Sequence, residues 1–233
     1  MAIATVRGAT RDYVQGAYTV RALRGVDLDV EPGDFLALMG PSGSGKSTLL
    51  NLIGGLDLPT SGEVTIEGTQ LSTMSASALS QLRRDRLGFV FQSYNLIPVL
   101  SAYENAEFVL LLQGKSQAER RKTVLQTLKD VGLEGLEDRR PNQLSGGQQQ
   151  RVAVARAIAG KPALVLADEP TANLDSTTGA ALIELMQMLN REHGITFVFA
   201  THDPKVMAAA NRVVRLEDGE ISSDERRETA PQA

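Results

Sequence analysis

The stretch LMGPSGSGKSTLL, from Leu38 to Leu50, decides the fold of this chain. It matches the pattern G-x-x-x-x-G-K-[ST], with Gly40 at the first position and Gly45-Lys46-Ser47 at the last three. The apolar run 35–39 before it predicts a buried strand, and residues 47–53 after it predict the start of a helix. A glycine loop between a strand and a helix is the setting in which this pattern binds the phosphates of a nucleotide.

The residue types in this loop suit a phosphate chain. Glycines let the backbone curl so that successive N–H groups point at one anion, and the start of a helix adds the positive end of its dipole. Lys46 is predicted to reach the outer phosphates, and the Ser47 hydroxyl to hold Mg²⁺. The alternative is a Gly/Ser-rich turn that only connects two elements. The loop residues expected to contact the nucleotide are Gly40, Pro41, Ser42, Gly43, Ser44, Gly45, Lys46, Ser47 and Thr48.

Length and composition fit one large globular domain or two small ones. The chain has 233 residues, of which 42% are hydrophobic and 22% are charged. The net charge of −4 argues against a nucleic-acid groove, because such a groove needs a basic face. Cysteine is absent, which excludes a disulfide framework and a thiolate metal site and fits a reducing cytoplasm.

No segment of the sequence predicts insertion into a membrane. Residues 1–6 lack the basic region and the long apolar core of a signal peptide. No apolar run approaches the ~18 residues that are needed to cross a bilayer. We therefore expect a soluble protein, and any role at a membrane is expected to run through a partner.

Three stretches in the first third of the chain alternate like half-buried strands: residues 2–7, 20–30 and 62–68. Together they predict an antiparallel sheet beside the strand that leads to the glycine loop. Tyr13 and Tyr18 are expected in the loop between the first two strands. Such a tyrosine is a surface or packing residue in most proteins, and the alternative is a ring that stacks on adenine.

The middle of the chain predicts a helical region. A short apolar strand ends at Gln92, and two capping boxes, opened by Ser101 and Ser116, each start a helix. The apolar run 108–112 in the first of these helices is expected in the core. The alternative is that part of this run lines a groove for a partner helix.

A second glycine turn, Ser145-Gly146-Gly147-Gln148, precedes a predicted helix from about Gln149 to Ala159. Ser145 and Gln148 have the spacing of a capping box, so one interpretation is a well-capped helix. The other is a second phosphate site, made from the serine hydroxyl and the exposed N–H groups of a helix start. The two interpretations are compatible, and the spacing alone does not select the second.

The clearest buried strand covers residues 163–167 and runs into Asp168-Glu169. A strand that is apolar along its whole length belongs in a parallel sheet, whose ligands lie at the carboxyl ends of the strands. The glycine loop and this acidic pair both lie at such ends. We expect Asp168 to hold Mg²⁺ through a water and Glu169 to face the site of attack. The alternative is an acidic pair in a solvated loop.

An amphipathic helix and another buried strand follow the acidic pair. The helix starts at Asp175 or Ser176, and His193 near its end is expected to be a favourable cation or a plain surface residue. The buried strand 195–200 leads to His202. This histidine therefore also lies at the carboxyl end of a strand, on the phosphate side.

The last part of the chain predicts a short helix and a hairpin. Asp203-Pro204 is a good N-cap and first position for a helix. An Asp218-Gly219 turn predicts a hairpin over residues 215–221. The segment from Ser222 onward is polar and rich in charge, and it is expected to be a flexible tail.

The order of these motifs resembles that of the ATP-binding cassette (ABC) ATPases, the nucleotide-binding subunits of ABC transporters. The resemblance covers the chain to about Ile221, and its most specific part is Leu144-Ser145-Gly146-Gly147-Gln148. P-loop kinases and GTPases carry the first glycine loop but lack this LSGGQ segment. The segments 54–62 and 88–98 are similar to the macrolide-export and lipoprotein-release subfamily, whose members carry different cargo.

The resemblance implies an α/β fold: a P-loop NTPase with a RecA-like parallel core sheet, an N-terminal antiparallel β subdomain and an inserted α-helical subdomain. Residues 1–233 are then a single ATP-binding cassette domain. The nucleotide-binding core is expected to comprise residues 1–92 and 161–221. The helical insert with LSGGQ is expected at 93–160, and the flexible tail at 222–233.

The resemblance also implies roles for single residues. Tyr13 is similar to the aromatic residue that stacks on adenine, and Val20 to the apolar residue beneath the base. Gln92 resembles the glutamine that reaches Mg²⁺ and senses the membrane partner. The residues expected to act in catalysis are Glu169 as the general base, His202 at the γ-phosphate, Gln92 and Lys46, and those expected at the metal are Ser47, Gln92 and Asp168.

The resemblance further implies a head-to-tail homodimer that holds two ATP molecules. Each ATP is bound by the phosphate loop of one subunit and by Ser145, Gly146, Gly147 and Gln148 of the other. The segment 172–175 resembles the loop that crosses between the subunits, although the family more often has Ser or Gly in place of Ala172 and Ala in place of Asn173.

The implied function is a Mg²⁺-dependent ATPase that drives an integral membrane permease subunit from the cytoplasmic face of the cell membrane. Export or extrusion of the macrolide-export type is the first expectation, with contact to the permease near residues 92–103. One alternative is a cassette that transmits force across the envelope without transport. Soluble cassettes of DNA repair or translation rank lower, because they carry a long coiled coil or two cassettes in one chain.

Overall fold

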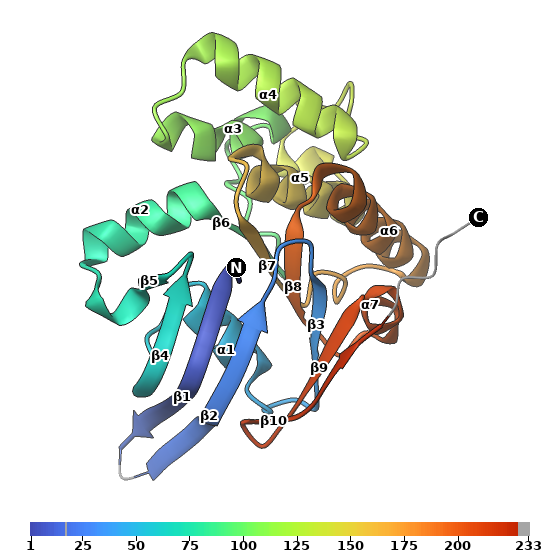
Figure 1. Ribbon diagram of the computed structural model, residues 1–233. Coiled ribbons are helices and arrows are strands. Elements are labelled where there is room, and N and C mark those ends of the chain that lie inside the picture. The colour runs from blue at the N-terminus through green and yellow to red at the C-terminus, as the bar shows by residue number, and fades with distance from the viewer. Residues whose placement is uncertain (17, 228–233) are drawn as a thin grey trace.

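The computed structural model describes residues 1–16 and 18–227 and contains two sheets (Figure 1). One sheet is antiparallel, with strand order β2-β1-β4-β5, and the other has the order β10-β9-β3-β8-β7-β6. The second sheet is parallel except at its edge, where β10 pairs antiparallel with β9. The strands are β1 (Ala4–Gln15), β2 (Tyr18–Val30), β3 (Phe35–Met39), β4 (Ser61–Ile66), β5 (Thr69–Gln70), β6 (Leu87–Phe91), β7 (Leu164–Asp168), β8 (Thr196–Ala200), β9 (Arg212–Glu217) and β10 (Glu220–Arg226).

Helices cover both faces of the parallel sheet. Helix α1 packs between the two sheets, where it contacts β1, β2 and β4 on one side and β7 and β8 on the other. On the opposite face, α3, α4 and α5 contact one another and form the upper part of the molecule in Figure 1. The helices are α1 (Lys46–Ile53), α2 (Ala76–Arg86), α3 (Ala102–Leu112), α4 (Gln117–Asp130), α5 (Gly146–Ala159), α6 (Ser176–His193) and α7 (Pro204–Ala209).

The parallel sheet buries both of its faces, which explains why its central strands are apolar along their whole length. In β3, Leu36 and Leu38 point toward the core shared with α1 and the antiparallel sheet. Phe35, Ala37 and Met39 point toward the second core, beneath the helices. The predicted α/β fold with an antiparallel β subdomain is therefore confirmed.

Most of the predicted helix starts are also confirmed. The capping boxes at Ser101, Ser116 and Ser145 are all formed, with each serine accepting from the N–H three residues later. Asp175 caps α6, and Asp203 caps α7. Helix α5 nevertheless begins at Gly146 and not near Gln149, because the Ser145 cap allows the helix to include both glycines.

Two other predictions near the chain ends are wrong. Tyr13 lies within β1 and Tyr18 begins β2, so neither lies in the expected loop. Irregularities in the β1–β2 register interrupt the alternation of apolar and polar residues that marks a strand. This explains why the first strand was predicted to end at residue 7. The segment from Ser222 continues β10 as far as Arg226, in place of the expected flexible tail. The rest of that tail, residues 228–233, lies outside the described residues.

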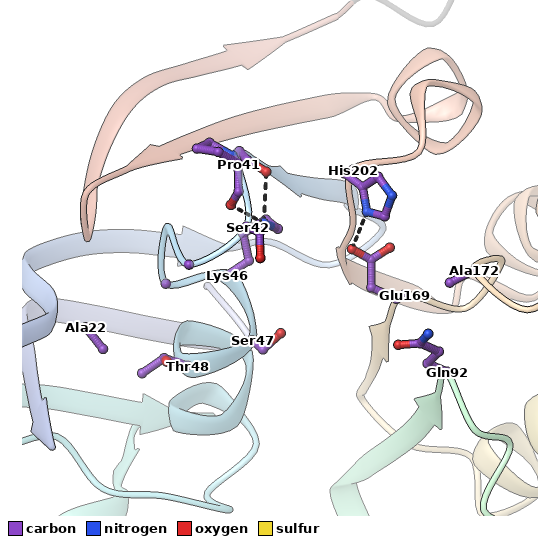
Figure 2. A pocket seen from close by; sticks show the side chains of 13 residues that line it. Ala22, Pro41, Ser42, Lys46, Ser47, Thr48, Gln92, Glu169, Ala172 and His202 are labelled. Carbon is purple, nitrogen blue, oxygen red and sulfur yellow. Dashed lines mark hydrogen bonds and ion pairs between the residues drawn. The ribbon is translucent and has the colours of Figure 1, made fainter. Parts of the chain in front are cut away.

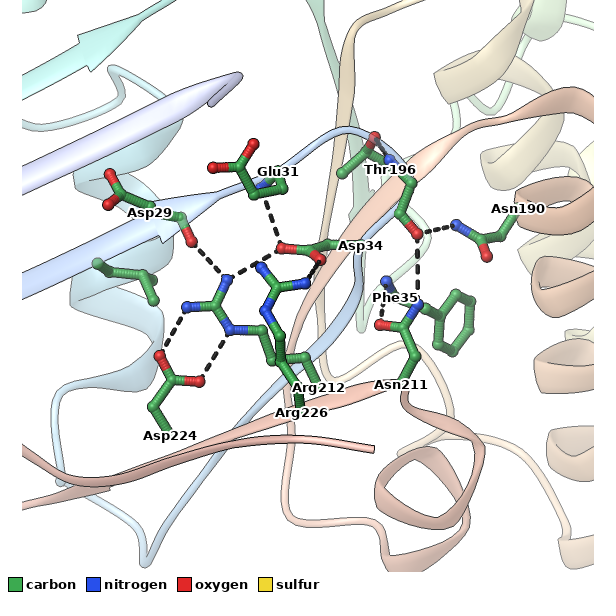
Figure 3. A network of polar contacts seen from close by, with 12 residues as sticks. Asp29, Glu31, Asp34, Phe35, Asn190, Thr196, Asn211, Arg212, Asp224 and Arg226 are labelled. Atoms are coloured by element: carbon green, nitrogen blue, oxygen red, sulfur yellow. Dashed lines mark hydrogen bonds and ion pairs between the residues drawn. The ribbon is translucent and has the colours of Figure 1, made fainter. Parts of the chain in front are cut away.

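A buried ion cluster lies at the amino end of β3 (Figure 3). Asp34 accepts from Arg212 and Arg226, each at 3.0 Å. Arg212 also donates to both carboxylate oxygens of Asp224, at 2.6 and 2.8 Å. These hydrogen bonds from Arg212 hold the pKa of Asp224 below its ordinary value. The cluster fastens β9 and β10 to the start of the central strand.

Helix lengths and hydropathy bear on membrane insertion. Across residues 1–16 and 18–227, no helix combines the length and the apolar character that a bilayer crossing requires. The longest helix, α6, is amphipathic and buries one side against the core.

Candidate active site

An open cavity of about 740 Å³ lies at the carboxyl ends of the parallel strands. Figure 2 shows the loop between β3 and α1 on one side of it, with Glu169, His202 and Gln92 across from that loop. This is the edge at which parallel sheets bind their ligands. The residues that line the cavity are Ala22, Gly40, Pro41, Ser42, Gly43, Gly45, Lys46, Ser47, Thr48, Gln92, Glu169, Ala172 and His202.

Two glycines of the loop occupy places where no other residue fits. Gly40 and Gly45 have φ angles of 151° and 103°, which residues other than glycine rarely adopt. A Cβ atom on Gly40 would collide with the carbonyl oxygen of Leu216. A Cβ atom on Gly45 would lie 2.6 Å from the carbonyl oxygen of Ala22. The loop therefore passes close to β2 and β9, and this packing fixes its curvature.

The start of α1 is suited to an anion. Its N-cap is Gly45, which supplies no side-chain acceptor, so the first N–H groups of the helix remain available at the cavity wall. The Lys46 ammonium lies beside them and donates to the carbonyl oxygens of Gly40 at 2.9 Å and Pro41 at 2.8 Å. A positive charge and free main-chain donors in one loop fit the phosphates of a nucleotide.

Ser47 and Asp168 form an oxygen pair beside the loop. The Ser47 hydroxyl donates to Asp168 Oδ1 at 2.9 Å, which joins the start of α1 to the end of β7. Burial raises the pKa of Asp168 above its ordinary value, although the bond from Ser47 acts in the opposite direction. A nearby cation would reverse the effect of burial on this carboxyl group.

This oxygen pair fits Mg²⁺ bound together with a nucleotide. Mg²⁺ prefers oxygen ligands and is bound in nucleotide sites by one or two carboxylates and the substrate phosphates. Within the described part of the chain, no group of three or more His, Cys, Asp and Glu side chains is placed to hold a metal. The two oxygens of Ser47 and Asp168 beside the phosphate loop suit a metal ion that shares its ligands with phosphate.

Glu169 is held by two neighbours at the far side of the cavity (Figure 2). Its Oε1 lies 2.7 Å from His202 Nδ1, and its Oε2 accepts from the Thr201 hydroxyl at 3.0 Å. The Glu169 side chain is 20% exposed and that of His202 is 75% exposed. Glu169 also has a φ of 46°, a strained value that marks many functional positions. A carboxylate fixed in this way is placed to take a proton from a water in the cavity.

Gln92 lies at the end of β6, where its side chain is exposed at the cavity. Its carbonyl oxygen accepts from the side-chain amide of Asn173 at 3.0 Å. Ala172, the neighbour of Asn173, also lines the cavity. The segment predicted to cross between subunits is thus bonded to the segment predicted to sense the membrane partner.

The two residues predicted to contact adenine are not among the described residues that line the cavity. These residues, Tyr13 and Val20, are register partners in β1 and β2. The Tyr13 hydroxyl donates to Asp57 at 2.8 Å, and the Arg11 guanidinium lies 4.6 Å from the centre of the ring. The side chain of Val20 is exposed. Their roles toward the base stay predictions.

The LSGGQ turn also lies outside this cavity. The Ser145 hydroxyl accepts from the N–H of Gln148 at 3.3 Å and caps α5. Of the described residues that surround Lys46 in the cavity, none comes from the turn 145–148. Ser44 and Asp168 are likewise not among the described residues that line the cavity: the Ser44 side chain is buried, and Asp168 accepts from the Ser47 hydroxyl.

Two residues at the site were not predicted from the sequence. Thr201 supports Glu169, and its place at the end of an apolar strand, beside His202, is a signal that could have identified it. Ala22 lines the cavity through a stretch of β2 where the register with β1 shifts. Local sequence gives no sign of that shift.

Comparisons with known proteins agree on one family. A family model described as ABC transporter matches residues 23–172. The chain is 47% identical over 225 residues to the ABC transporter ATP-binding protein MJ0796 of Methanocaldococcus jannaschii, with 95% of this chain and 96% of that protein covered. It is 47% identical over 218 residues to the lipoprotein-releasing system ATP-binding protein LolD of Anaeromyxobacter dehalogenans, with 93% and 91% covered.

A longer relative and a solved structure complete the comparison. The chain is 44% identical over 224 residues to the macrolide export ATP-binding/permease protein MacB of Mannheimia succiniciproducens. That match covers 96% of this chain but 35% of the longer protein. The solved dimeric structure of the cassette MJ0796 in a post-hydrolysis state, bound to ADP and Pi, superposes with a TM-score of 0.88 at 46% identity, covering 96% of this chain and 98% of that one.

Proposed function

Because this chain belongs to the ABC transporter ATP-binding proteins, ATPases that use ATP and Mg²⁺, we propose that it is the cassette subunit of an exporter of the macrolide-export or lipoprotein-release type. One observation carries the proposal. The chain surrounds its cavity with a phosphate loop and a supported carboxylate, yet it holds its LSGGQ turn outside that cavity. A second copy can supply the missing turn.

The residues around the cavity have different roles in hydrolysis. Lys46 and the N–H groups at the start of α1 bind the outer phosphates and stabilise the charge that develops on them. Ser47 and Asp168 would hold Mg²⁺, which when bound would neutralise phosphate charge. Glu169 accepts a proton from the attacking water.

His202 and Thr201 act through Glu169. Each contacts one oxygen of its carboxylate, so together they fix the direction in which it accepts a proton. The exposed His202 ring is also free to contact the γ-phosphate. Gln92 lies across the cavity from the phosphate loop and would contact Mg²⁺ together with Ser47 and Asp168.

The proposed assembly is a head-to-tail homodimer with two ATP molecules between the subunits. In it, Ser145, Gly146, Gly147 and Gln148 of one copy contact the nucleotide on Lys46 of the other. Serine hydroxyl and N–H groups at the start of α5 are suitable donors for phosphate oxygens. The dimeric structure solved for MJ0796 with ADP and Pi supports a dimeric assembly.

The proposed second partner is an integral membrane permease. Support comes from MacB, an ATP-binding/permease protein of which this chain spans 35%. The chain therefore corresponds to the ATP-binding part, and it would act at the cytoplasmic face of the membrane through a permease. The proposed contact surface is the segment after β6, from Gln92 to Tyr103, whose exposed residues are Gln92, Ser93, Asn95, Pro98 and Val99.

Substitution of Glu169 tests the proposed function. Glu169→Gln keeps the shape of the side chain but removes its ability to accept a proton, so turnover should fall by roughly 10² or more. In the presence of Mg²⁺ and ATP the variant should accumulate as a dimer, measured by size-exclusion chromatography with light scattering. Glu184→Gln, an exposed glutamate on α6, is the matched control and should behave like the parent. A Glu169→Gln protein that stays monomeric with ATP at high concentration would contradict the proposal.

A further inference from the structure

The mechanism above gives no role to Gln150, a fully buried polar side chain. Gln150 lies in α5, two residues after the LSGGQ turn, and it is 0% exposed. Its side chain does not bond within its own helix. It extends toward the carboxyl ends of β6 and β7.

The side-chain amide of Gln150 joins two separate segments of the site. Its Nε2 donates to the carbonyl oxygen of Pro170 at 2.7 Å and to that of Phe91 at 3.3 Å. Phe91 directly precedes Gln92, and Pro170 directly follows Glu169. A single amide therefore connects the main chain beside both residues that face the phosphate loop.

The nitrogen of the Gln150 amide makes both of these hydrogen bonds. Both partners are carbonyl oxygens, which only accept hydrogen bonds, so the nitrogen of Gln150 must point toward them. Its Oε1 is buried and has no hydrogen-bond partner in the part of the chain that the structure describes. A buried acceptor without a partner opposes folding, so stability alone does not explain a glutamine here.

Helix α5 holds the same segment at a second point. Arg156 lies further along the helix and donates to the carbonyl oxygen of Tyr94 at 2.9 Å and also to that of Asn95. With Gln150 on Phe91 and Arg156 on Tyr94, the helix bonds the main chain on both sides of Gln92. A displacement of α5 must therefore move this segment with it.

We propose that Gln150 is a positioning residue that links the two nucleotide sites of the dimer through α5. The inference rests on the proposed head-to-tail assembly, in which the turn at the start of α5 contacts one nucleotide while Glu169 serves the other. Contact at Ser145 shifts α5, and the amide of Gln150 carries that shift to the main chain of Gln92 and Glu169. Occupation of one site thereby places the base in the second site.

The substitution Gln150→Met tests this role because methionine has a similar length and no amide. The value of kcat should fall at least about tenfold, since small misplacements of catalytic groups are costly. The KM for ATP should stay within about twofold, because no atom of Gln150 touches the cavity. The Tm should stay within about 4 °C of the parent value, because loss of the unpaired acceptor offsets loss of the donors.

The neighbouring glutamine offers a matched control. Gln149 donates to the carbonyl oxygen of Leu144, within the turn that opens its own helix, and makes no bond to β6 or β7. Gln149→Met should keep the parent kcat. If kcat of Gln150→Met is within twofold of the parent, or if its Tm falls by more than 4 °C together with kcat, the positioning role is overturned.

Amide hydrogen exchange gives a second measurement that does not depend on turnover. The N–H of Tyr94 donates to Phe91, and the N–H of Ala172 donates to Glu169. Both amides should exchange several-fold faster in Gln150→Met than in Gln149→Met, because their segments lose a common anchor. Equal rates would overturn the inference.

Failure of the inference can be told apart from failure of the proposed function. If Glu169→Gln does not dimerise with ATP, the head-to-tail assembly is wrong, and with it the link between two sites. If Glu169→Gln dimerises and Gln150→Met turns over ATP at the parent rate, only the role of Gln150 is wrong.

Discussion

The two ends of β3 carry polar clusters of opposite character. At the amino end, Asp34 and Arg212 are nearly inaccessible, and each is paired with partners from the same chain. At the carboxyl end, the first N–H groups of α1 have no side-chain cap, and within the described part of the chain Lys46 bonds only to main-chain carbonyls. The five residues of β3 thus separate a cluster of paired charges from a group of donors that can bind a ligand.

This difference shows how one strand can serve both stability and chemistry. Charges that are satisfied inside the chain hold β9 and β10 in place and have no capacity left for a ligand. Charges and donors at the other end are left for a phosphate chain to complete, which binds an anion at the cost of fold stability. Substitutions at the two ends should therefore affect different measurements.

Arg212→Leu should have the largest effect, and it should act on stability. The substitution leaves Asp34 buried with the half-exposed Arg226 as its remaining arginine, and breaking a buried pair in this way costs about 3–5 kcal/mol. Urea denaturation at neutral pH measures the loss. The KM for ATP of the folded protein should not change, because the cluster lies at the opposite end of β3 from the cavity.

Arg226→Leu is the control for the amino end. It removes the exposed partner and leaves Arg212 on Asp34, so the free energy of unfolding should fall by about 1 kcal/mol or less. Equal losses for the two arginine variants would mean that burial does not set the strength of this cluster.

Lys46→Ala should have the next largest effect, and it should act on hydrolysis. Loss of the charge that stabilises the outer phosphates should lower kcat/KM by about 10²–10³, while the Tm changes little. A coupled phosphate-release assay measures the rate. Lys205→Ala, which removes an exposed ammonium bonded to Ser176 outside the cavity, should retain activity. A Lys46→Ala protein with the parent activity would contradict the proposal that the carboxyl end of β3 serves hydrolysis.

Protonation of Asp224 should have the smallest effect and should act at the amino end. Because Arg212 holds the pKa of Asp224 below its ordinary value, the ionised form contributes stability that is fully present above pH ~4. That contribution is lost as the pH falls from ~4 through the lower pKa of the folded state. The contribution is about 1 kcal/mol or less, because the Asp224 side chain is 37% exposed.

Asp224→Asn isolates this titration. The variant should start less stable than the parent at neutral pH, and the difference should shrink as the pH falls below ~4. Thermal unfolding at several pH values measures both curves. A difference that stays constant from neutral pH to pH ~3 would show that the charge of Asp224 contributes nothing.

Features set by neighbouring residues were predictable from the sequence. The strand, loop and helix around Gly40 and the capping box at Ser145 depend on residues a few positions apart, and both form as predicted. Helix α2 was not predicted from the sequence. It is mostly polar and its one buried residue is Leu79, so its apolar periodicity is weak.

Features set by distant residues were not predictable. The bonds of Gln150 span 59 residues to Phe91 and 20 to Pro170, and no local pattern signals them. The support of Glu169 by Thr201 likewise crosses 32 residues. At the site, the carboxyl-end rule indicated that the loop, the acidic pair and His202 would share one edge, but not which side chains would hold one another.

The ion cluster at the start of β3 also bears on how the protein is made. Asp34 leaves the ribosome early, whereas its two arginines follow 178 and 192 residues later. A nascent chain that lacks β9 and β10 cannot bury this carboxylate in its paired form, and so the central sheet is completed only after Arg226 has been synthesised. Until then, the growing polypeptide has to keep the edge of its newest strand away from other chains.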